Sequence, residues 1–184
     1  MLKIYNTLTK KEESLHLTKD KKVKVYSCGP TVYEFAHIGN LRSFIMADIL
    51  VRTLKANGSE VDWVINLTDI DDKTIKGTVS EFGNDAGVSQ LKTYTQRYAE
   101  KFFSDLREVG IDTEQIRFIN VTDVIPQIQE FVVDLIEKGF AYKADDGSTY
   151  FSIEKYQEKF GDYGSLVGEK FIEGKKVGAR IKND

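Results

Sequence analysis

The sequence predicts an α/β fold in which a parallel sheet has helices between its strands. Runs of β-favouring residues alternate with segments whose apolar residues recur every three or four positions, which is typical of β-α-β units. The first predicted unit consists of a strand at Val23–Ser27, a helix opening at Leu41 and a strand at Asp62–Leu67. A polar motif follows each strand, so both motifs are expected at the carboxyl edge of the sheet, where ligands bind in such folds.

The composition is that of an ordinary globular protein. The 184 residues are 41% hydrophobic and 30% charged, with a net charge of −3, which is not the signature of a strong nucleic-acid binder. The chain has one cysteine, no apolar run of membrane-spanning length and no signal peptide, so we expect a cytoplasmic protein in a reducing compartment, without a membrane partner. We also expect a monomer, divided into residues 1–139 and 140–184.

The stretch Val25–Asn40 reads VYSCGPTVYEFAHIGN and joins the first strand to the first helix through a Gly-Pro turn. This arrangement favours phosphate binding, because free backbone N–H groups and the positive end of the helix dipole face a ligand there. Gly39 would let a nucleotide approach the backbone, and His37 and Asn40 would donate hydrogen bonds to phosphate oxygens. A lone histidine beside apolar residues is more often structural, so the tetrapeptide His37–Asn40 alone would be weak evidence.

The helical segments are predicted from their apolar periodicity. The first helix should end at Asn57-Gly58, and its inward face should consist of Leu41, Ile45, Ile49 and Leu54. After a loop at Glu81–Gly87, a long amphipathic helix should end near Gly110, with an aromatic stripe assigned to the core: Leu91, Tyr94, Tyr98, Phe102, Leu106 and Val109.

A further helix is predicted at about Val124–Lys138, capped by Thr122 and stopped by Gly139. Its inward residues should be Ile128, Val132, Leu135 and Ile136. The following segments, Ala141–Lys143 and Ser148–Ser152, flank an Asp-Gly turn and predict a β-hairpin.

Two motifs together resemble the catalytic domain of the cysteinyl-tRNA synthetase family. CGPTVYEFAHIGN at Cys28–Asn40 and NLTDIDDK at Asn66–Lys73 are similar to the family stretches CGPTVY…HIGH and NITDIDDK. The resemblance extends from Tyr5 to about Arg180. It implies a Rossmann-like class I synthetase domain that binds nucleotide on a parallel sheet. It also implies that an inserted α+β region starts near residue 140 and includes Tyr163–Leu166.

The resemblance implies that ATP, with Mg²⁺, activates cysteine to cysteinyl adenylate, and that the cysteinyl group then passes to tRNA(Cys). The catalytic residues would be His37 and Asn40, which would donate to phosphate oxygens as charge builds in the transition state. The family commonly has histidine at the position of Asn40, so we expect weaker stabilisation there. The ATP-binding residues would be Pro30, Thr31, His37, Ile38, Gly39 and Asn40, and the cysteine-binding residues would be Cys28, Gly29, Thr31 and Thr68.

Cys28 matches a family ligand of a zinc ion that receives the substrate thiolate. The other family ligands lie beyond Asp184, as do the lysine-bearing KMSKS loop and the anticodon-binding domain, and neither His16 nor His37 matches a ligand position. We therefore expect this chain to be the N-terminal part of a ligase, to bind zinc weakly or not at all, and to be inactive alone. Cys28 would then be a small residue in a tight turn.

Several alternatives remain open at this point. The chain could be a catalytically inert nucleotide-binding or interaction module, or part of a related ligase that joins cysteine to an amino sugar. Thr68-Asp69 could cap a helix through Asp71-Asp72-Lys73 as well as line the site. The carboxylates of Asp69, Asp71 and Asp72 also form a candidate divalent-metal cluster.

Overall fold

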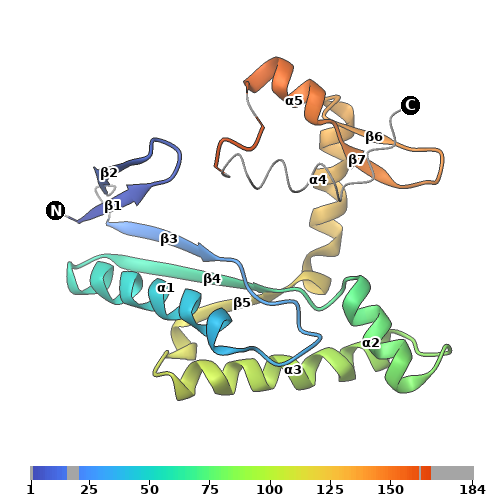
Figure 1. The fold of residues 1–184 in the computed structure, drawn as a ribbon, viewed down its shortest axis with the longest axis horizontal. Coiled ribbons are helices and arrows are strands. Elements are labelled where there is room, and N and C mark those ends of the chain that lie inside the picture. Colours follow the sequence, from blue (N-terminus) through green and yellow to red (C-terminus); the bar gives the residue numbers. More distant parts are fainter. Residues whose placement is uncertain (1, 16–20, 162, 167–184) are drawn as a thin grey trace. The chain divides into compact units, whose positions relative to one another are not determined.

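Figure 1 shows the fold as a computed structural model that describes residues 2–15, 21–161 and 163–166. The chain forms two compact units. One comprises residues 17–126, and the other combines residues 1–16 with residues 127–184. His16 and the predicted family match at residues 167–180 lie outside the described residues.

A three-stranded parallel sheet in the order β3-β4-β5 forms the centre of the first unit. β3 (Lys22–Ser27) aligns Val25 with Trp63 of β4 (Glu60–Leu67), and Trp63 in turn aligns with the first residue of β5 (Ile116–Asn120). The predicted parallel α/β sheet is thereby confirmed.

Helices make both crossovers in this sheet. α1 (Ile38–Ala56) connects β3 to β4, while α2 (Asp72–Phe82), α3 (Val88–Glu108) and the short 3-10 helix η1 (Thr113–Gln115) connect β4 to β5. α1 and α3 lie on the same side of the sheet (Figure 1). Both strand ends that carry the sequence motifs therefore open at one edge, beside the amino end of α1.

The core lies between the sheet and these two helices. Trp63, Ile65 and Leu67 alternate along β4 and bury their side chains, as expected for the covered face of a sheet. The rings of Phe44 and Phe102 meet edge to face across the helix pair, with centroids 5.1 Å apart. Trp63 also donates its indole N–H to Ser27 Oγ at 3.0 Å, so the largest core side chain has its polar atom satisfied.

The buried face of α1 differs in part from the predicted one. Leu41 and Leu54 are buried as predicted, but Ile49 is 52% exposed. The helix packs through Phe44 and Val51, and Ile49 lies five positions after Phe44, roughly 140° around the helix axis. The prediction for Ile49 was therefore wrong, and the buried stripe is centred on the phenylalanine.

The predicted core face of α3 and the predicted loop before it can be compared with the structure. α3 buries Tyr94, Phe102 and Leu106, which confirms the aromatic stripe as core. Glu81 and Phe82 form the end of α2 and not the start of the loop, because the chain leaves the helix only at Gly83, where φ is +91°.

Two hairpins belong to the second unit. β1 (Lys3–Asn6) pairs with β2 (Lys11–Ser14), and β6 (Ala141–Lys143) pairs with β7 (Thr149–Phe151), both antiparallel. Gly147 has a φ of +82° in the turn between β6 and β7. The hairpin predicted from the Asp-Gly turn is confirmed.

Two helices accompany these hairpins. α4 (Ile125–Glu137) follows the 3-10 helix η2 (Val121–Val124), and α5 (Ile153–Phe160) follows β7. Val132, Leu135 and Ile136 of α4 are half-buried, whereas Ile128 is 41% exposed, so its predicted inward position was wrong. Within the described ranges, no helix has the length and apolar character needed to cross a membrane.

Replacing Phe102 by alanine should lower the unfolding free energy of the sheet unit by about 3–5 kcal/mol, because a fully buried ring leaves a cavity. Urea unfolding followed by Trp63 fluorescence measures this change, since the sequence has one tryptophan and it lies in β4. Phe82→Ala is the matched control. Its side chain is 42% exposed, so a loss of about 1 kcal/mol or less is expected. Equal losses in the two variants would contradict this description of the core.

Candidate active site

His37 is the N-cap of α1, and its imidazole takes part in the capping. The Nδ1 atom accepts a hydrogen bond from the backbone N–H of Gly39 at 3.0 Å. A neutral imidazole that accepts at Nδ1 carries its hydrogen on Nε2. The cap therefore leaves the exposed His37 ring with an Nε2–H donor at the amino end of the helix.

Asn40 completes the capping box from the third helical position. Its Oδ1 accepts the backbone N–H of His37 at 3.1 Å, so its amide group keeps the two Nδ2 hydrogens as donors. His37 and Asn40 thus each use their acceptor inside the cap. The predicted phosphate-binding pair consists of neutral side chains whose remaining polar hydrogens are donors.

Gly39 serves this cap in a way that the sequence did not suggest. A Cβ at Gly39 would lie 2.8 Å from Cε1 and 2.9 Å from Nδ1 of His37, closer than real contacts allow. The absence of a side chain therefore lets the imidazole fold back over the first turn of the helix. This requirement is separate from the approach of a nucleotide to the backbone.

Gly29 lies against the backbone of the neighbouring strand. A Cβ at Gly29 would lie 1.7 Å from the carbonyl oxygen of Asn66, so only glycine fits there. The N–H of Gly29 donates to the Asn66 side-chain Oδ1 at 2.8 Å. The turn after β3 is thereby held tightly to the end of β4.

Asn66 organises this junction, although sequence reasoning had not singled it out. Its Oδ1 also accepts from the Tyr26 hydroxyl at 2.8 Å, and its Nδ2 donates to Thr68 Oγ1 at 3.2 Å. Because the Thr68 oxygen accepts this bond, its own hydrogen is left to donate to a ligand. The signal in the sequence is a polar amide between two apolar residues, Ile65 and Leu67, near the end of the strand.

Thr31 and Thr68, both predicted to bind cysteine, pair directly. They form an isolated parallel bridge in which Val32 N donates to Thr68 O at 3.1 Å and Thr68 N donates to Pro30 O at 3.0 Å. Sheet pairing thus continues past the ends of β3 and β4. The structure brings Gly29, Thr31 and Thr68 together at one edge.

The residues after Thr68 have roles different from those predicted. Asp69 accepts the backbone N–H of Thr122 at 3.0 Å and also the Thr122 hydroxyl. The Thr122 hydroxyl is therefore engaged with Asp69, so the prediction that Thr122 caps α4 was wrong. These two hydrogen bonds join the end of β4 to the turn after β5.

The cap of α2 is Asp71 and not Thr68-Asp69. One carboxylate oxygen of Asp71 accepts the backbone N–H groups of Lys73 at 2.7 Å and Thr74 at 3.3 Å. Asp69 and Asp71 are thus engaged in separate hydrogen bonds. No three ligating side chains in the part of the chain that the structure describes gather to hold a metal ion.

Cys28 lies at the start of the turn, with an exposed thiol. Its Sγ makes a weak hydrogen bond to the carbonyl oxygen of Gly29 at 3.8 Å. Among the described residues, Cys28 belongs to no group of three or more ligating side chains that could hold a metal ion. The described residues do not by themselves fit a zinc ion, which takes three or four protein ligands.

A cavity of about 530 Å³ opens between α3 and the carboxyl ends of β4 and β5. Its lining includes Leu67, Asp69, Phe103, Phe118 and Thr122. None of the residues predicted to bind ATP or cysteine lines this cavity. The predicted site is instead the exposed edge formed by the turn after β3, the amino end of α1 and Thr68.

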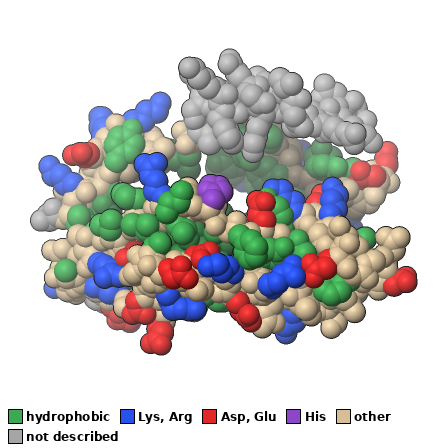
Figure 2. Space-filling view, turned by 60° about the horizontal axis from the view of Figure 1, so that its bottom comes forward, with side chains coloured by type: hydrophobic (Ala, Val, Ile, Leu, Met, Phe, Trp, Pro, Cys, Tyr) green, Lys and Arg blue, Asp and Glu red, His purple; other side chains and the backbone are tan. Residues whose placement is uncertain are grey.

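Charges of both signs lie on the face of the molecule shown in Figure 2. Figure 2 shows lysine and arginine side chains interspersed with aspartate and glutamate over one face of the molecule. In the sheet, Arg117 pairs with Asp62 at 2.8 Å, and its hydrogen bond lowers the pKa of the Asp62 carboxyl. The predicted binding residues include no lysine, arginine, aspartate or glutamate.

A parallel sheet whose glycine turn leads into a capped helix at the carboxyl edge is the arrangement of Rossmann-like α/β domains. The family model described as "tRNA synthetases class I (C) catalytic domain" matches residues 14–183. The chain therefore belongs to this family.

Curated relatives are similar over nearly the whole chain. A cysteine–tRNA ligase of Pyrococcus abyssi is 40% identical over 181 residues, covering 98% of this chain and 35% of the relative. A cysteine–tRNA ligase of Leptospira interrogans is 39% identical over 183 residues, covering 100% of this chain and 36% of the relative. The chain thus spans about a third of the length of these relatives.

A solved structure is also similar. The crystal structure of Plasmodium falciparum tryptophanyl-tRNA synthetase aligns with a TM-score of 0.43 and 19% sequence identity. The alignment covers 64% of this chain and 28% of that one.

Replacing Asp71 by alanine should lower the unfolding free energy by about 1 kcal/mol, the usual loss for an N-cap that accepts backbone N–H groups. The neighbouring Asp72→Ala is the control, because Asp72 is exposed in the first turn and accepts none of the capping hydrogen bonds. Thermal or urea unfolding of both variants measures the difference. A larger loss in Asp72→Ala than in Asp71→Ala would contradict the assignment of the cap.

Proposed function

We propose that the chain forms the N-terminal part of the catalytic domain of a cysteine–tRNA ligase. The reaction joins cysteine to ATP, giving cysteinyl adenylate and pyrophosphate, and then transfers the cysteinyl group to tRNA(Cys). The capping arrangement at α1 carries the proposal, because it presents the His37 Nε2–H and the Asn40 amide hydrogens where the helix dipole favours phosphate. The names of the relatives support cysteine as the amino acid.

ATP would lie over the turn after β3 and the amino end of α1. Gly39 and Ile38 would offer backbone contact there, and Pro30 and Thr31 would form the opposite side of the nucleotide site. His37 and Asn40 would donate to oxygens of the α-phosphate. Mg²⁺ would accompany ATP and offset part of its negative charge.

Cysteine would lie beside the junction of β3 and β4. The Thr68 hydroxyl keeps a hydrogen to donate because its oxygen accepts from Asn66. Together with Thr31, Gly29 and Cys28 it would hold the amino acid so that one carboxylate oxygen faces the α-phosphorus. This geometry needs no protein nucleophile.

In the chemical step, a carboxylate oxygen of cysteine forms a bond to the α-phosphorus. The bond from that phosphorus to the bridging oxygen breaks, and pyrophosphate leaves with its electron pair. Negative charge builds on the α-phosphate oxygens as five-coordinate phosphorus is approached. Donors already aligned by the α1 cap stabilise that charge without reorganising.

Pyrophosphate exchange tests the proposal in a hybrid protein. This chain would replace the matching segment of the Leptospira interrogans relative, because the alignment with that relative covers 100% of this chain. We expect exchange of labelled pyrophosphate into ATP that depends on cysteine and on no other amino acid, followed by charging of tRNA(Cys). Exchange that depends on a different amino acid would overturn the assignment, and circular dichroism establishes that the hybrid is folded.

Replacing His37 by alanine in this hybrid should lower exchange by about 2–4 kcal/mol of transition-state stabilisation, the scale for a lost charge-stabilising donor. The affinity for cysteine should change little. His37→Asn is the matched variant, because asparagine is a good N-cap but lacks the imidazole Nε2–H. An His37→Asn protein with wild-type exchange and wild-type stability would show that His37 serves only as a cap.

A further inference from the structure

The segment from Thr31 to His37 links the strand end to the cap of α1. Its first part is held firmly, since Thr31 pairs with Thr68 and Val32 is 2% exposed. From Tyr33 to Ala36 the segment is neither helix nor strand. Among the described residues, one hydrogen bond from another element reaches the backbone of these four residues, and it comes from Tyr94.

The Tyr94 hydroxyl donates to the carbonyl oxygen of Tyr33 at 2.9 Å. Tyr94 belongs to α3 and is 7% exposed, and this bond is partly buried. Burial raises the pKa of Tyr94 to about 12. The hydroxyl therefore remains protonated, and available as a donor, throughout the neutral range.

Gly77 of α2 makes room for this tyrosine. A Cβ at Gly77 would lie 2.2 Å from the Tyr94 hydroxyl oxygen and 2.5 Å from its ring carbon Cζ. Glycine inside a helix costs about 1 kcal/mol relative to alanine. Glycine at position 77 is explained by the close approach of the Tyr94 ring, which brings the Tyr94 hydroxyl to the Tyr33 carbonyl oxygen.

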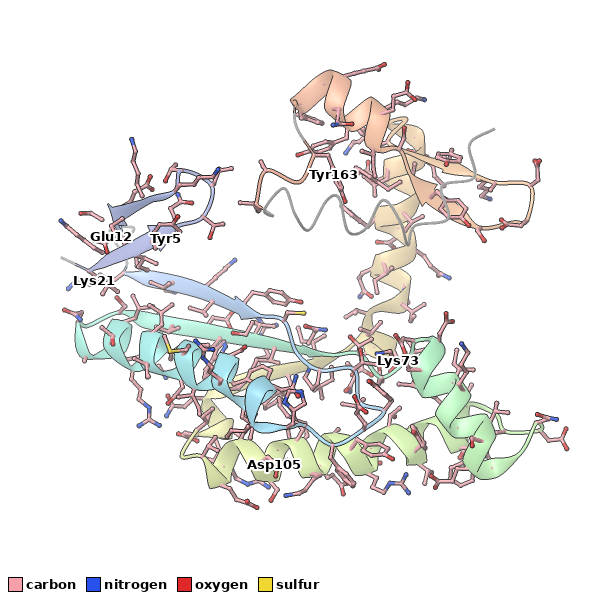
Figure 3. The ribbon with its side chains drawn as sticks, viewed as in Figure 1. Tyr5, Glu12, Lys21, Lys73, Asp105 and Tyr163 are labelled. Atoms are coloured by element: carbon pink, nitrogen blue, oxygen red, sulfur yellow. The ribbon has the colours of Figure 1, made fainter. Side chains whose placement is uncertain are left out.

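Lys73 of α2 contacts the side chain of Tyr33. Its ammonium donates to the Tyr33 hydroxyl at 3.2 Å and lies 4.5 Å from the centre of the Tyr33 ring. Figure 3 labels Lys73 at the amino end of α2, where its backbone N–H donates to the capping carboxylate of Asp71 at 2.7 Å. The hydrogen bond with Tyr33 raises the pKa of Lys73, so the charged form is the one held.

Phe35 and Ala36 fix the remainder of the segment. The Phe35 ring lies against the Tyr98 ring, with centroids 5.1 Å apart, and Ala36 packs against the hydrophobic core. Tyr33 and Phe35 thus attach the segment to the pair of helices that follows β4, and Ala36 attaches it to the core. His37 comes directly after the last of these contacts.

We propose that Lys73 and Tyr94 are positioning residues, which clamp Tyr33 from two sides and thereby hold the His37 imidazole in its capping orientation. Asp71 and Gly77 serve the same clamp, one by placing Lys73 and the other by admitting Tyr94. The inference rests on the proposed function in one respect, namely that the His37 Nε2–H donates to a phosphate oxygen. The clamp itself is a property of the folded chain.

Nuclear magnetic resonance of the 184-residue chain tests the clamp without any substrate. The sequence has two histidines, so imidazole ¹H–¹⁵N correlation spectra contain two sets of signals, and His37→Gln identifies the set of His37. In the wild type we expect Nδ1 as acceptor and Nε2 as the protonated nitrogen. We also expect the Gly39 amide, which donates to Nδ1, to be protected from hydrogen exchange.

Tyr94→Phe and Lys73→Met should move the His37 signals towards those of a free histidine and lower the protection of the Gly39 amide by about tenfold, the scale for one lost hydrogen bond. Gly77→Ala keeps the Tyr94 hydroxyl but displaces it, so the same change is expected. Unaltered His37 signals and Gly39 protection in folded Tyr94→Phe and Lys73→Met proteins would overturn the proposal.

Two control variants separate the clamp from general destabilisation. Lys76→Met removes an exposed lysine further along α2, and Lys92→Met removes an exposed lysine on α3 that donates no hydrogen bond to the segment. Both should leave the His37 signals and Gly39 protection as in the wild type. Equal effects of controls and clamp variants would show that the signals report overall stability, and would overturn the clamp.

The outcome is independent of the pyrophosphate-exchange experiment. A hybrid that activates no cysteine would overturn the proposed function. The His37 spectra of the 184-residue chain would not be affected by that result. Conversely, loss of the clamp effect with normal exchange would show that His37 is oriented by its own capping box alone.

Discussion

The contact between Gly29 and Asn66 determines how the rest of the candidate site is arranged. The missing Cβ of Gly29 allows its Cα to lie against the Asn66 carbonyl, closer than any other residue permits. Parallel pairing can then run on beyond β3 and β4 to Thr31 and Thr68. That extension fixes where the chain sets out towards α1, and so where the capping residues His37 and Asn40 are placed.

Much of this fold could be predicted from the sequence because its signals are local. Strand residues around Val25 and Trp63, the periodicity of α3 and the Asp-Gly hairpin turn each depend on neighbours in the chain, and each is found in the structure. The motifs at Cys28–Asn40 and Asn66–Lys73 also gave the family. The prediction was wrong where packing between elements determines which face of a helix is buried. Ile49 satisfies helical periodicity but lies away from the face set by Phe44.

The polar contacts of the site were harder to predict because they join residues far apart in the sequence. Thr122 resembles an N-cap when read locally, yet Asp69, 53 positions earlier, accepts both its N–H and its hydroxyl. Tyr94 was correctly placed in the core, but its hydroxyl contact with Tyr33 spans 61 positions. Gly77 gave no signal beyond being a glycine within a helix. Such pairings follow from the three-dimensional arrangement of β4, α2 and α3.

The capping box of α1 has a thermodynamic consequence. An imidazolium has hydrogens on both nitrogens and cannot accept, so the bond from the Gly39 N–H to Nδ1 requires the neutral ring. Asn40, where the resembling family commonly has histidine, likewise contributes no charge, but its Oδ1 fixes the His37 backbone. The conformational entropy of aligning these donors is lost when the protein folds and not when a phosphate arrives. Compared with a charged side chain at this place, the neutral donors attract a phosphate less strongly, but aligning them costs less conformational entropy when the phosphate binds.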